Sequence, residues 1–230
     1  MPFPSPRSLS PIAATEERAP ALRADAARNR ARIVAAAVEV FARRGLDAST
    51  AEIARRAGVG EATLFRRFPT KDDLIAAIVA TQMEEAIEIV AECLEEDDPW
   101  RGIERFLYEM TARSNQDRGV SDAAKDRCIA SAALAPQRRR MVELCGELVR
   151  RGQRDGAVRE DIAGQDLIFL VSAASAVAAI PFPGLREDLW KRYLGLILDG
   201  LRPEGATRLR PGAPSRRLIE LAEVPEDSAG

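Results

Sequence analysis

The chain contains no histidine, and this absence removes several classes of function at once. The usual zinc and iron sites rely on imidazole ligands, and histidine is the commonest general base in catalysis. Cysteine is also scarce, since Cys93, Cys128 and Cys145 are odd in number and widely spaced. That pattern predicts neither a disulfide framework nor a metal site. We therefore expect a protein without a metal or a cofactor.

Long apolar runs are missing as well. The longest apolar stretch, at about 167–180, is too short to span a bilayer and is interrupted by Ser172 and Ser175. The first residues lack the charged start and the long apolar core of a secretion signal. We expect a cytoplasmic protein with no membrane association.

Strand patterns are the third absence. Runs that alternate β-branched and aromatic residues do not occur, and aromatic residues make up 5% of the chain. Ala, Leu, Arg and Glu dominate instead, and they are good helix formers, so we predict an all-α fold. The expected helices lie at about 25–44, 49–57, 61–68, 70–94, from Pro99 onward, 121–131, 136–154, 167–180 and 185–201.

The predicted organisation is a small N-terminal domain followed by a larger helical one. Residues 1–22 and 203–230 are rich in Pro, Gly or Ser and are expected to be a disordered and a loose tail. Between Arg23 and Lys71 stand eleven basic and five acidic residues, a net charge of +6 in a chain whose net charge is −2. A positive segment on a negative remainder suggests that one end faces a polyanion, although solvated arginine-rich helices would give the same balance.

The most informative stretch begins at Ser49. Ser49 and Glu52 form a capping-box pattern for one short helix, and Gly58 ends it. A second short helix follows the Gly58–Gly60 turn and is closed by Pro69. Two short helices joined by a glycine-containing turn, behind a longer helix, are the parts of a helix-turn-helix, so we predict this motif within a DNA-binding domain at 23–70.

Several features follow one another in a fixed order between Ala31 and Val79. They are an apolar helix with a phenylalanine near its end, Gly45, the pair Ile53-Ala54, an AGV turn, a TL-aromatic triplet, Phe68, and Lys71 before an acidic helix start. This order closely resembles the TetR family of transcriptional regulators. The resemblance covers roughly a fifth of the chain, and the remaining helices match only the general pattern of the family.

The resemblance implies DNA-contacting roles for particular residues of this sequence. Phosphate contacts set the register and much of the affinity, whereas base contacts set the sequence that is read. The residues so implicated are Thr50, Thr63, Phe65, Arg67 and Lys71 for the DNA backbone, and Gly60, Glu61 and Ala62 for the bases.

This sequence departs from the family pattern at two of these positions. Position 65 is commonly tyrosine, and Phe65 has no hydroxyl to donate to a phosphate, so it either stays near the backbone or simply packs. Glu61 either accepts a hydrogen bond from a cytosine amino group or favourably begins its helix. The arginines at 28, 30 and 32 extend the phosphate-binding surface, reach into a minor groove or are simply solvated.

The helical body at 71–202 is expected to bind a ligand and to dimerise. The segments at 167–180 and 185–201 are apolar on several sides, so most of their surface must be buried. They either pack against a second copy of the chain, as the resemblance implies, or form the core of a monomer. The family also implies an effector pocket among the middle helices, where Met and aromatic residues are candidates to line it. Met and aromatic residues at helical spacing more often belong to a core than to a pocket. Its candidate lining is Met83, Phe106, Met110, Met141, Cys145 and Phe169.

The predicted function is a sequence-specific DNA-binding transcriptional regulator, a homodimeric repressor that a small-molecule effector releases from a palindromic double-stranded operator. A ligand-independent or partner-controlled regulator is the first alternative, and a helical protein-interaction scaffold is the second. Only DNA binding would weaken steeply as salt rises, because counterions are released. Catalytic signatures such as a phosphate-binding loop or a nucleophile elbow are absent, so we expect no enzyme.

Overall fold

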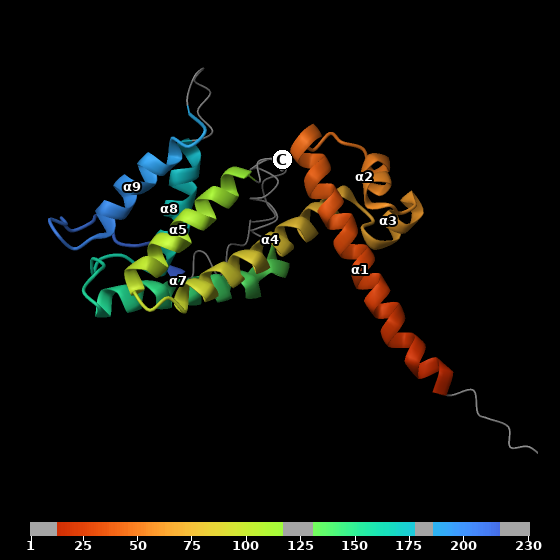
Figure 1. The fold of residues 1–230 in the computed structure, drawn as a ribbon, viewed down its shortest axis with the longest axis horizontal. Coiled ribbons are helices and arrows are strands. Elements are labelled where there is room, and N and C mark those ends of the chain that lie inside the picture. The colour runs from red at the N-terminus through yellow and green to blue at the C-terminus, as the bar shows by residue number, and fades with distance from the viewer. Residues whose placement is uncertain (1–12, 117–130, 178–185, 217–230) are drawn as a thin grey trace, which may run out of the picture.

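The computed structural model describes residues 13–116, 131–177 and 186–216, and for residues 13–24 only the backbone. Over these ranges it contains eight α-helices, one short 3-10 helix and no strand, which confirms the all-α prediction (Figure 1). No helix in the described ranges combines the length and the apolar character needed to cross a membrane. In order, the elements are α1 (Ala13–Arg44), α2 (Thr50–Ala57), α3 (Glu61–Arg67), α4 (Lys71–Leu94), α5 (Pro99–Gln116), η1 (Ala132–Leu134), α7 (Ala135–Arg154), α8 (Gly164–Ala176) and α9 (Trp190–Leu201).

The signals that predicted α2 and α4 are present as hydrogen bonds. Ser49 is the N-cap of α2 and its hydroxyl accepts from the Glu52 N–H at 3.2 Å. At α4 the capping box is reciprocal, because the Thr70 hydroxyl accepts from the Asp73 N–H and the Asp73 carboxylate accepts from the Thr70 N–H. Each cap satisfies N–H groups that have no partner inside the helix, so these two starts are fixed by neighbouring residues alone.

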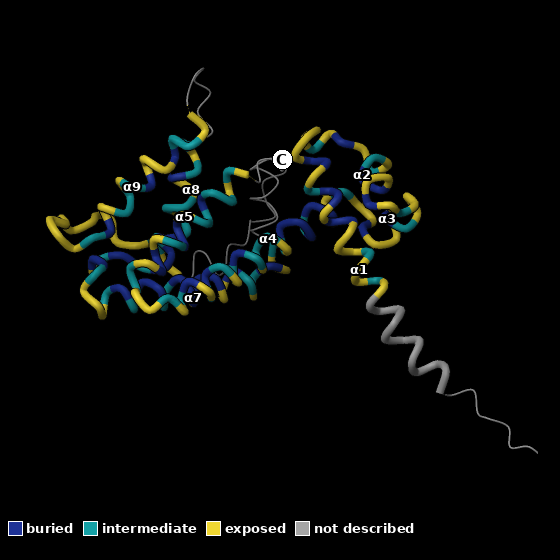
Figure 2. The backbone as a smooth tube through the Cα atoms, in the orientation of Figure 1, coloured by how far each residue is buried: buried dark blue, intermediate teal, exposed yellow. Residues whose placement is uncertain are grey.

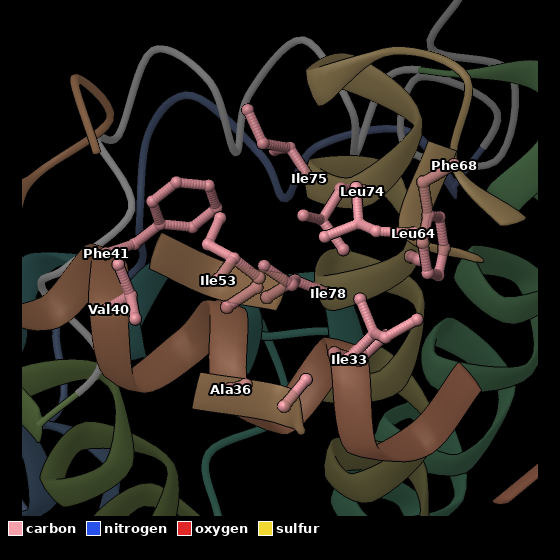
Figure 3. Packing of buried hydrophobic residues seen from close by; sticks show 14 of the residues in the cluster. Ile33, Ala36, Val40, Phe41, Ile53, Leu64, Phe68, Leu74, Ile75 and Ile78 are labelled. Atoms are coloured by element: carbon pink, nitrogen blue, oxygen red, sulfur yellow. The ribbon is translucent and has the colours of Figure 1, made fainter. Parts of the chain in front are cut away.

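The N-terminal lobe, called the head here, consists of α1 from residue 25, α2, α3 and the first turns of α4. Its core is continuous across all four helices, and Figure 3 shows side chains from each of them converging. The fully buried members include Ile33, Phe41, Ile53, Leu64, Leu74 and Ile78. A helix as short as α3 is marginal alone, so its position depends on the packing of Leu64 into this core.

The second lobe, called the body here, has its own core built from the later part of α4 with α5, α7, α8 and α9 (Figures 1 and 2). Helix α4 belongs to both cores: Leu74, Ile78 and Val79 are among its residues buried in the head, whereas Ala86, Val90 and Cys93 are buried in the body. The expected domain boundary after residue 70 therefore falls at the start of a helix whose first turns complete the head.

Helices α5 and α7 run antiparallel within the body. Near the end of α7, the Arg151 guanidinium donates to the carbonyls of Leu94 and Glu96, which lie where α4 ends and just before α5 begins. The C-terminal end of α5 and the N-terminal end of α7 consequently both lie on the side of the body nearer the head (Figure 1).

Several predicted boundaries differ from the observed ones. Helix α1 begins at Ala13, so residues 13–22 are helical and not part of a disordered tail; this segment is rich in Ala, Glu and Arg, which favour helix. Helix α9 begins at Trp190 and not near 185, because Arg186 and Leu189 close a tighter i→i+3 turn first. The expected helix at 121–131 lies almost entirely outside the described residues.

The segment after Pro203 has no regular helix up to residue 215, but it is less loose than expected. The Leu209 N–H donates to the Asp161 carboxylate at 2.7 Å, and the Arg159 guanidinium donates to the Thr207 carbonyl. Arg159 is itself buried and paired with Asp161, at 2.6 Å. The start of the tail is therefore held against the body by hydrogen bonds to Asp161 and to the buried Arg159.

Candidate nucleic-acid interface and body cavity

The turn between α2 and α3 is built around Gly58. This residue has φ 65° and ψ 38°, a left-handed conformation that costs side-chain-bearing residues free energy. Arg32 of α1 reaches across and donates to the carbonyls of Ala57 at 2.7 Å and Gly58 at 3.1 Å. The structure thus gives Arg32 a role in holding the turn, which was not among the roles considered for it from the sequence.

Helix α3 turns one side into the head and the other outward. Leu64 is almost completely buried, whereas Gly60, Glu61 and Ala62 are exposed at the start of the helix. Gly60 has an extended conformation that any residue adopts, and no atom lies within 4 Å of a Cβ added there. The structure thus brings the three residues expected to meet bases together on one open surface.

The other α3 residues of the expected interface lie on or beside this surface. Phe65 is 45% exposed, so its ring is not withdrawn into the core. Thr63 is half-buried and its hydroxyl accepts a long hydrogen bond from Arg66, at 3.4 Å. Thr50 is half-buried in the first turn of α2. These placements are compatible with DNA-backbone contacts.

The arginines of the head differ in how far they are already engaged. Ion pairs join Arg28 to Asp25, Arg56 to Glu39, and Arg44 to Glu52, and Arg30 lies 5.5 Å from the centre of the Phe68 ring. Within the described residues, no ion pair or hydrogen bond is found for the side chains of Arg43, Arg55 and Arg67. Arg67 is therefore a cation at the end of α3 that is available to a phosphate.

Lys71 has a structural partner that the sequence did not predict. Its ammonium donates to the carbonyls of Leu46 and Ala48, the latter at 3.0 Å, and lies 5.6 Å from the centre of the Phe41 ring. The side chain is half-buried and closes the loop between α1 and α2 against the start of α4. Its arrangement here serves the stability of the head, and a phosphate contact would add to that role or compete with it.

Replacing Lys71 with methionine is expected to lower the free energy of unfolding by about 2 kcal/mol, because two carbonyls lose a charged donor. Equilibrium urea unfolding measures the change. The matched control is Arg43→Met, since Arg43 is exposed and unpaired among the described residues, and its removal should change stability by less than about 0.5 kcal/mol. Equal stability of the two variants would contradict the structural role.

The body contains a cavity of about 290 Å³ where α4, α5, α7 and α8 meet. Of the six residues expected to line a pocket, Met83, Phe106, Met110 and Met141 do line it. The complete lining is Val79, Gln82, Met83, Ala86, Phe106, Met110, Arg113, Ser114, Arg138, Met141, Ile168, Val171 and Ser172.

The two other expected lining residues lie elsewhere. Cys145 is fully buried, and its Sγ lies 3.7 Å from the Sδ of Met141. Burial raises the pKa of the Cys145 thiol to about 12, so it is an unreactive thiol in the core. Phe169 is 47% exposed, because on α8 the cavity is lined by Ile168, Val171 and Ser172, and the next position along the helix faces away.

Comparison with known proteins agrees with this architecture over most of its length. Residues 33–78 match the family described as bacterial regulatory proteins of the tetR family, and residues 98–203 match the C-terminal domain described as that of SbtR-like transcriptional regulators. A TetR transcriptional regulator from Streptomyces coelicolor is 31% identical, with 76% of this chain and 98% of that chain covered and a TM-score of 0.58. A TetR transcription regulatory protein from Mycobacterium vanbaalenii is also 31% identical, covering 79% and 99% of the two chains, with a TM-score of 0.54.

The chain belongs to the TetR family of transcriptional regulators. Members of this family are DNA-binding transcription factors and not enzymes. For this TetR-family protein the helix-turn-helix is formed by α2 and α3, supported by α1, and the remaining helices form the C-terminal domain.

Sequence reasoning missed the polar part of the cavity in this TetR-family protein. Arg113 and Arg138 both line it, and neither was expected there. A signal for Arg138 was present: it lies on the same helical face as Leu134, Met141 and Cys145, all of them buried. A charged residue inside an apolar stripe is unusual in a surface helix and indicates a site that needs the charge.

Proposed function

We propose that this TetR-family protein is a homodimeric, sequence-specific repressor that a small-molecule effector releases from a palindromic DNA operator in the cytoplasm. The observation that carries the proposal is the outward surface of α3, where Gly60, Glu61 and Ala62 are open and Arg67 is available. A helix held in this way by the core of the head fits the major groove with its first residues toward the bases. Repression follows if the bound dimer covers a promoter.

Dimerisation is supported by the exposed surfaces of the last two helices. On α8 the exposed positions recur at helical spacing and are all uncharged: Phe169, Ser172, Ala173 and Ala176. On α9 Tyr193 is 43% exposed and Leu196 is 59% exposed. Small and apolar side chains in adjacent stripes leave a surface that a second copy would cover, and two-fold symmetry would then match a palindromic site.

Replacing Leu196 with glutamate is expected to prevent dimerisation, because a carboxylate would be buried without a partner in the interface. Analytical ultracentrifugation at low micromolar concentration should show the monomer mass, and duplex affinity should fall at least 10-fold, since the second half-site is no longer bound by a linked head. The control is Leu209→Glu, because Leu209 is 46% exposed and lies outside both stripes. A dimeric Leu196→Glu variant would contradict the proposed interface.

Release by an effector is supported by where the cavity lies along α4. Along α4 the buried residues up to Val79 belong to the head core, and the body core begins at Ala86. Between them, the cavity is lined on this helix by Val79, Gln82, Met83 and Ala86. A ligand in the cavity would therefore contact α4, a helix shared by both lobes. It would release DNA only if it bound more tightly to a body conformation in which the two heads no longer fit the operator.

A further inference from the structure

Glu61 is the first residue of α3 and its one acidic residue. Its side chain is exposed, and within the described residues its carboxylate takes part in no ion pair or hydrogen bond. Four other acids of the head are engaged with neighbours: Asp25 with Arg28, Glu39 with Arg56, Glu52 with Arg44, and Asp73 with Thr70. In the part of the chain that the structure describes, the Glu61 carboxylate is therefore an acceptor that no neighbour uses.

The surroundings of Glu61 are open. Figure 1 shows α3 on the side of the head away from the body. Gly60 before it has no side chain, and Ala62 after it carries only a methyl group, and both are exposed. In a helix-turn-helix the first residues of the second helix approach the base edges in the major groove. Glu61 is thus the longest side chain at the end of α3 that would meet the bases.

A carboxylate at this position lowers the affinity for DNA in general, because the phosphates repel it. The repulsion is offset only where a base supplies a hydrogen-bond donor, since a charge-assisted hydrogen bond then forms. An acid at a helix start also interacts favourably with the helix dipole, but that effect is the same for every DNA sequence. A carboxylate facing the bases therefore makes affinity depend on which base lies opposite.

The chemistry of the major groove selects one base. A carboxylate accepts hydrogen bonds and donates none, and only cytosine N4 and adenine N6 carry donors in this groove. Adenine places its N7 acceptor beside the amino group, where it would repel the second carboxylate oxygen. Guanine presents two acceptors, and thymine an acceptor and a methyl group. Cytosine is the base whose own edge offers a donor and no acceptor.

We propose that Glu61 accepts a hydrogen bond from the N4 amino group of a cytosine in each operator half-site and so makes one C·G pair a determinant of sequence specificity. The inference rests on the proposed function, in which α3 reads DNA, and adds the base that one residue recognises. The two-fold symmetry of the proposed dimer repeats this cytosine on the opposite strand of the other half-site.

The first test is selection of binding sites from random duplexes with the wild type, Glu61→Gln and Glu61→Ala. One position in each half-site should be cytosine with the wild type, adenine with Glu61→Gln, whose amide can bond N6 and N7 together, and unspecified with Glu61→Ala. The matched control is Asp72→Asn, which removes an exposed acid from the first turn of α4 and should enrich the wild-type sequence. The same base at every position with all these proteins would overturn the proposal.

A double-mutant cycle on the selected duplex then measures the contact directly. The C·G pair is replaced by uracil·adenine, which exchanges the N4 amino group for an acceptor without adding a methyl group. Fluorescence anisotropy should show about 10-fold weaker binding by the wild type and a change below about 2-fold for Glu61→Ala. Glu61→Ala should also bind the substituted duplex at least as tightly as the wild type does, because the repulsion is gone. An equal loss for both proteins would contradict the contact.

Two further results separate this inference from the proposed function. Enrichment of one two-fold-symmetric sequence by the wild type and by every variant would overturn the role of Glu61 and leave DNA reading standing. No enrichment by a folded wild-type dimer would contradict the proposed function, and the inference with it. Urea unfolding of each variant completes the test: reduced stability of Glu61→Gln with an unchanged selected sequence would assign the carboxylate to the helix start and overturn the proposal.

Discussion

A Gly60→Val variant is expected to fold normally and to lose operator binding by about 100-fold or more. Gly60 has φ −73° and ψ 149°, which valine adopts readily, and no atom lies within 4 Å of an added Cβ. The two methyl groups would therefore project from the start of α3 into the space that DNA would occupy in the proposed complex. Each displaced base contact is worth about 1–3 kcal/mol, and the branched side chain would displace more than one.

Duplex affinity from fluorescence anisotropy and stability from urea unfolding together test this expectation. The matched control is Gly58→Val, two residues earlier in the same turn. Gly58 has φ 65° and an added Cβ would lie 3.2 Å from the Arg32 guanidinium, so this variant should lose about 2 kcal/mol of stability. A Gly60→Val protein that binds its operator as tightly as the wild type would show that this end of α3 does not approach DNA closely.

The second large effect is expected at the crossing of α7 and α8. An added Cβ at Gly164 would lie 2.3 Å from the backbone nitrogen of Gly146 and 2.6 Å from the carbonyl carbon of Cys145. Both neighbours are backbone atoms in the middle of α7, so neither can rotate away as a side chain can. Gly164→Ala should force the helices apart and lower the free energy of unfolding by about 3 kcal/mol.

The control for this variant lies on the other side of the same crossing. A Cβ added at Gly146 meets only the flexible end of Arg150, at 3.2 Å, and alanine is the better helix former. Gly146→Ala should therefore change the free energy of unfolding by less than about 1 kcal/mol. If the two variants unfold at the same urea concentration, the close approach of α7 and α8 is not as the structure has it.

The helix-turn-helix was predictable from sequence because its signals are local. Ser49 and Thr70 cap helices through residues three positions away, and Gly58 ends α2 through its own backbone conformation. Four of the six residues that the family resemblance suggested for a pocket line the cavity, and each lies on the inward face that helical periodicity gives to α4, α5 or α7. In each case the information lies within one or two turns of the residue concerned.

What sequence did not predict depends on partners far along the chain. The Lys71 ammonium donates hydrogen bonds to carbonyls more than twenty positions away in the sequence. Its neighbours in the sequence therefore gave no sign of these partners. Arg138 was overlooked because its burial results from the meeting of several helices and not from its own neighbours. Phe169 was assigned to the cavity by residue type, and only the rotation of α8 in the packed body shows that it faces outward.

The most direct test of sequence-specific DNA recognition by this protein is the selection of binding sites from random DNA duplexes. The selection is made at near-physiological salt without added ligand. The account predicts enrichment of a two-fold-symmetric sequence by the wild type. It also predicts that Arg67→Ala binds this sequence more weakly, with a slope of affinity against salt reduced by about one. Arg139→Ala, on the exposed face of α7, should behave as the wild type. A folded dimer that enriches no sequence and shows no salt-sensitive duplex binding would contradict the account.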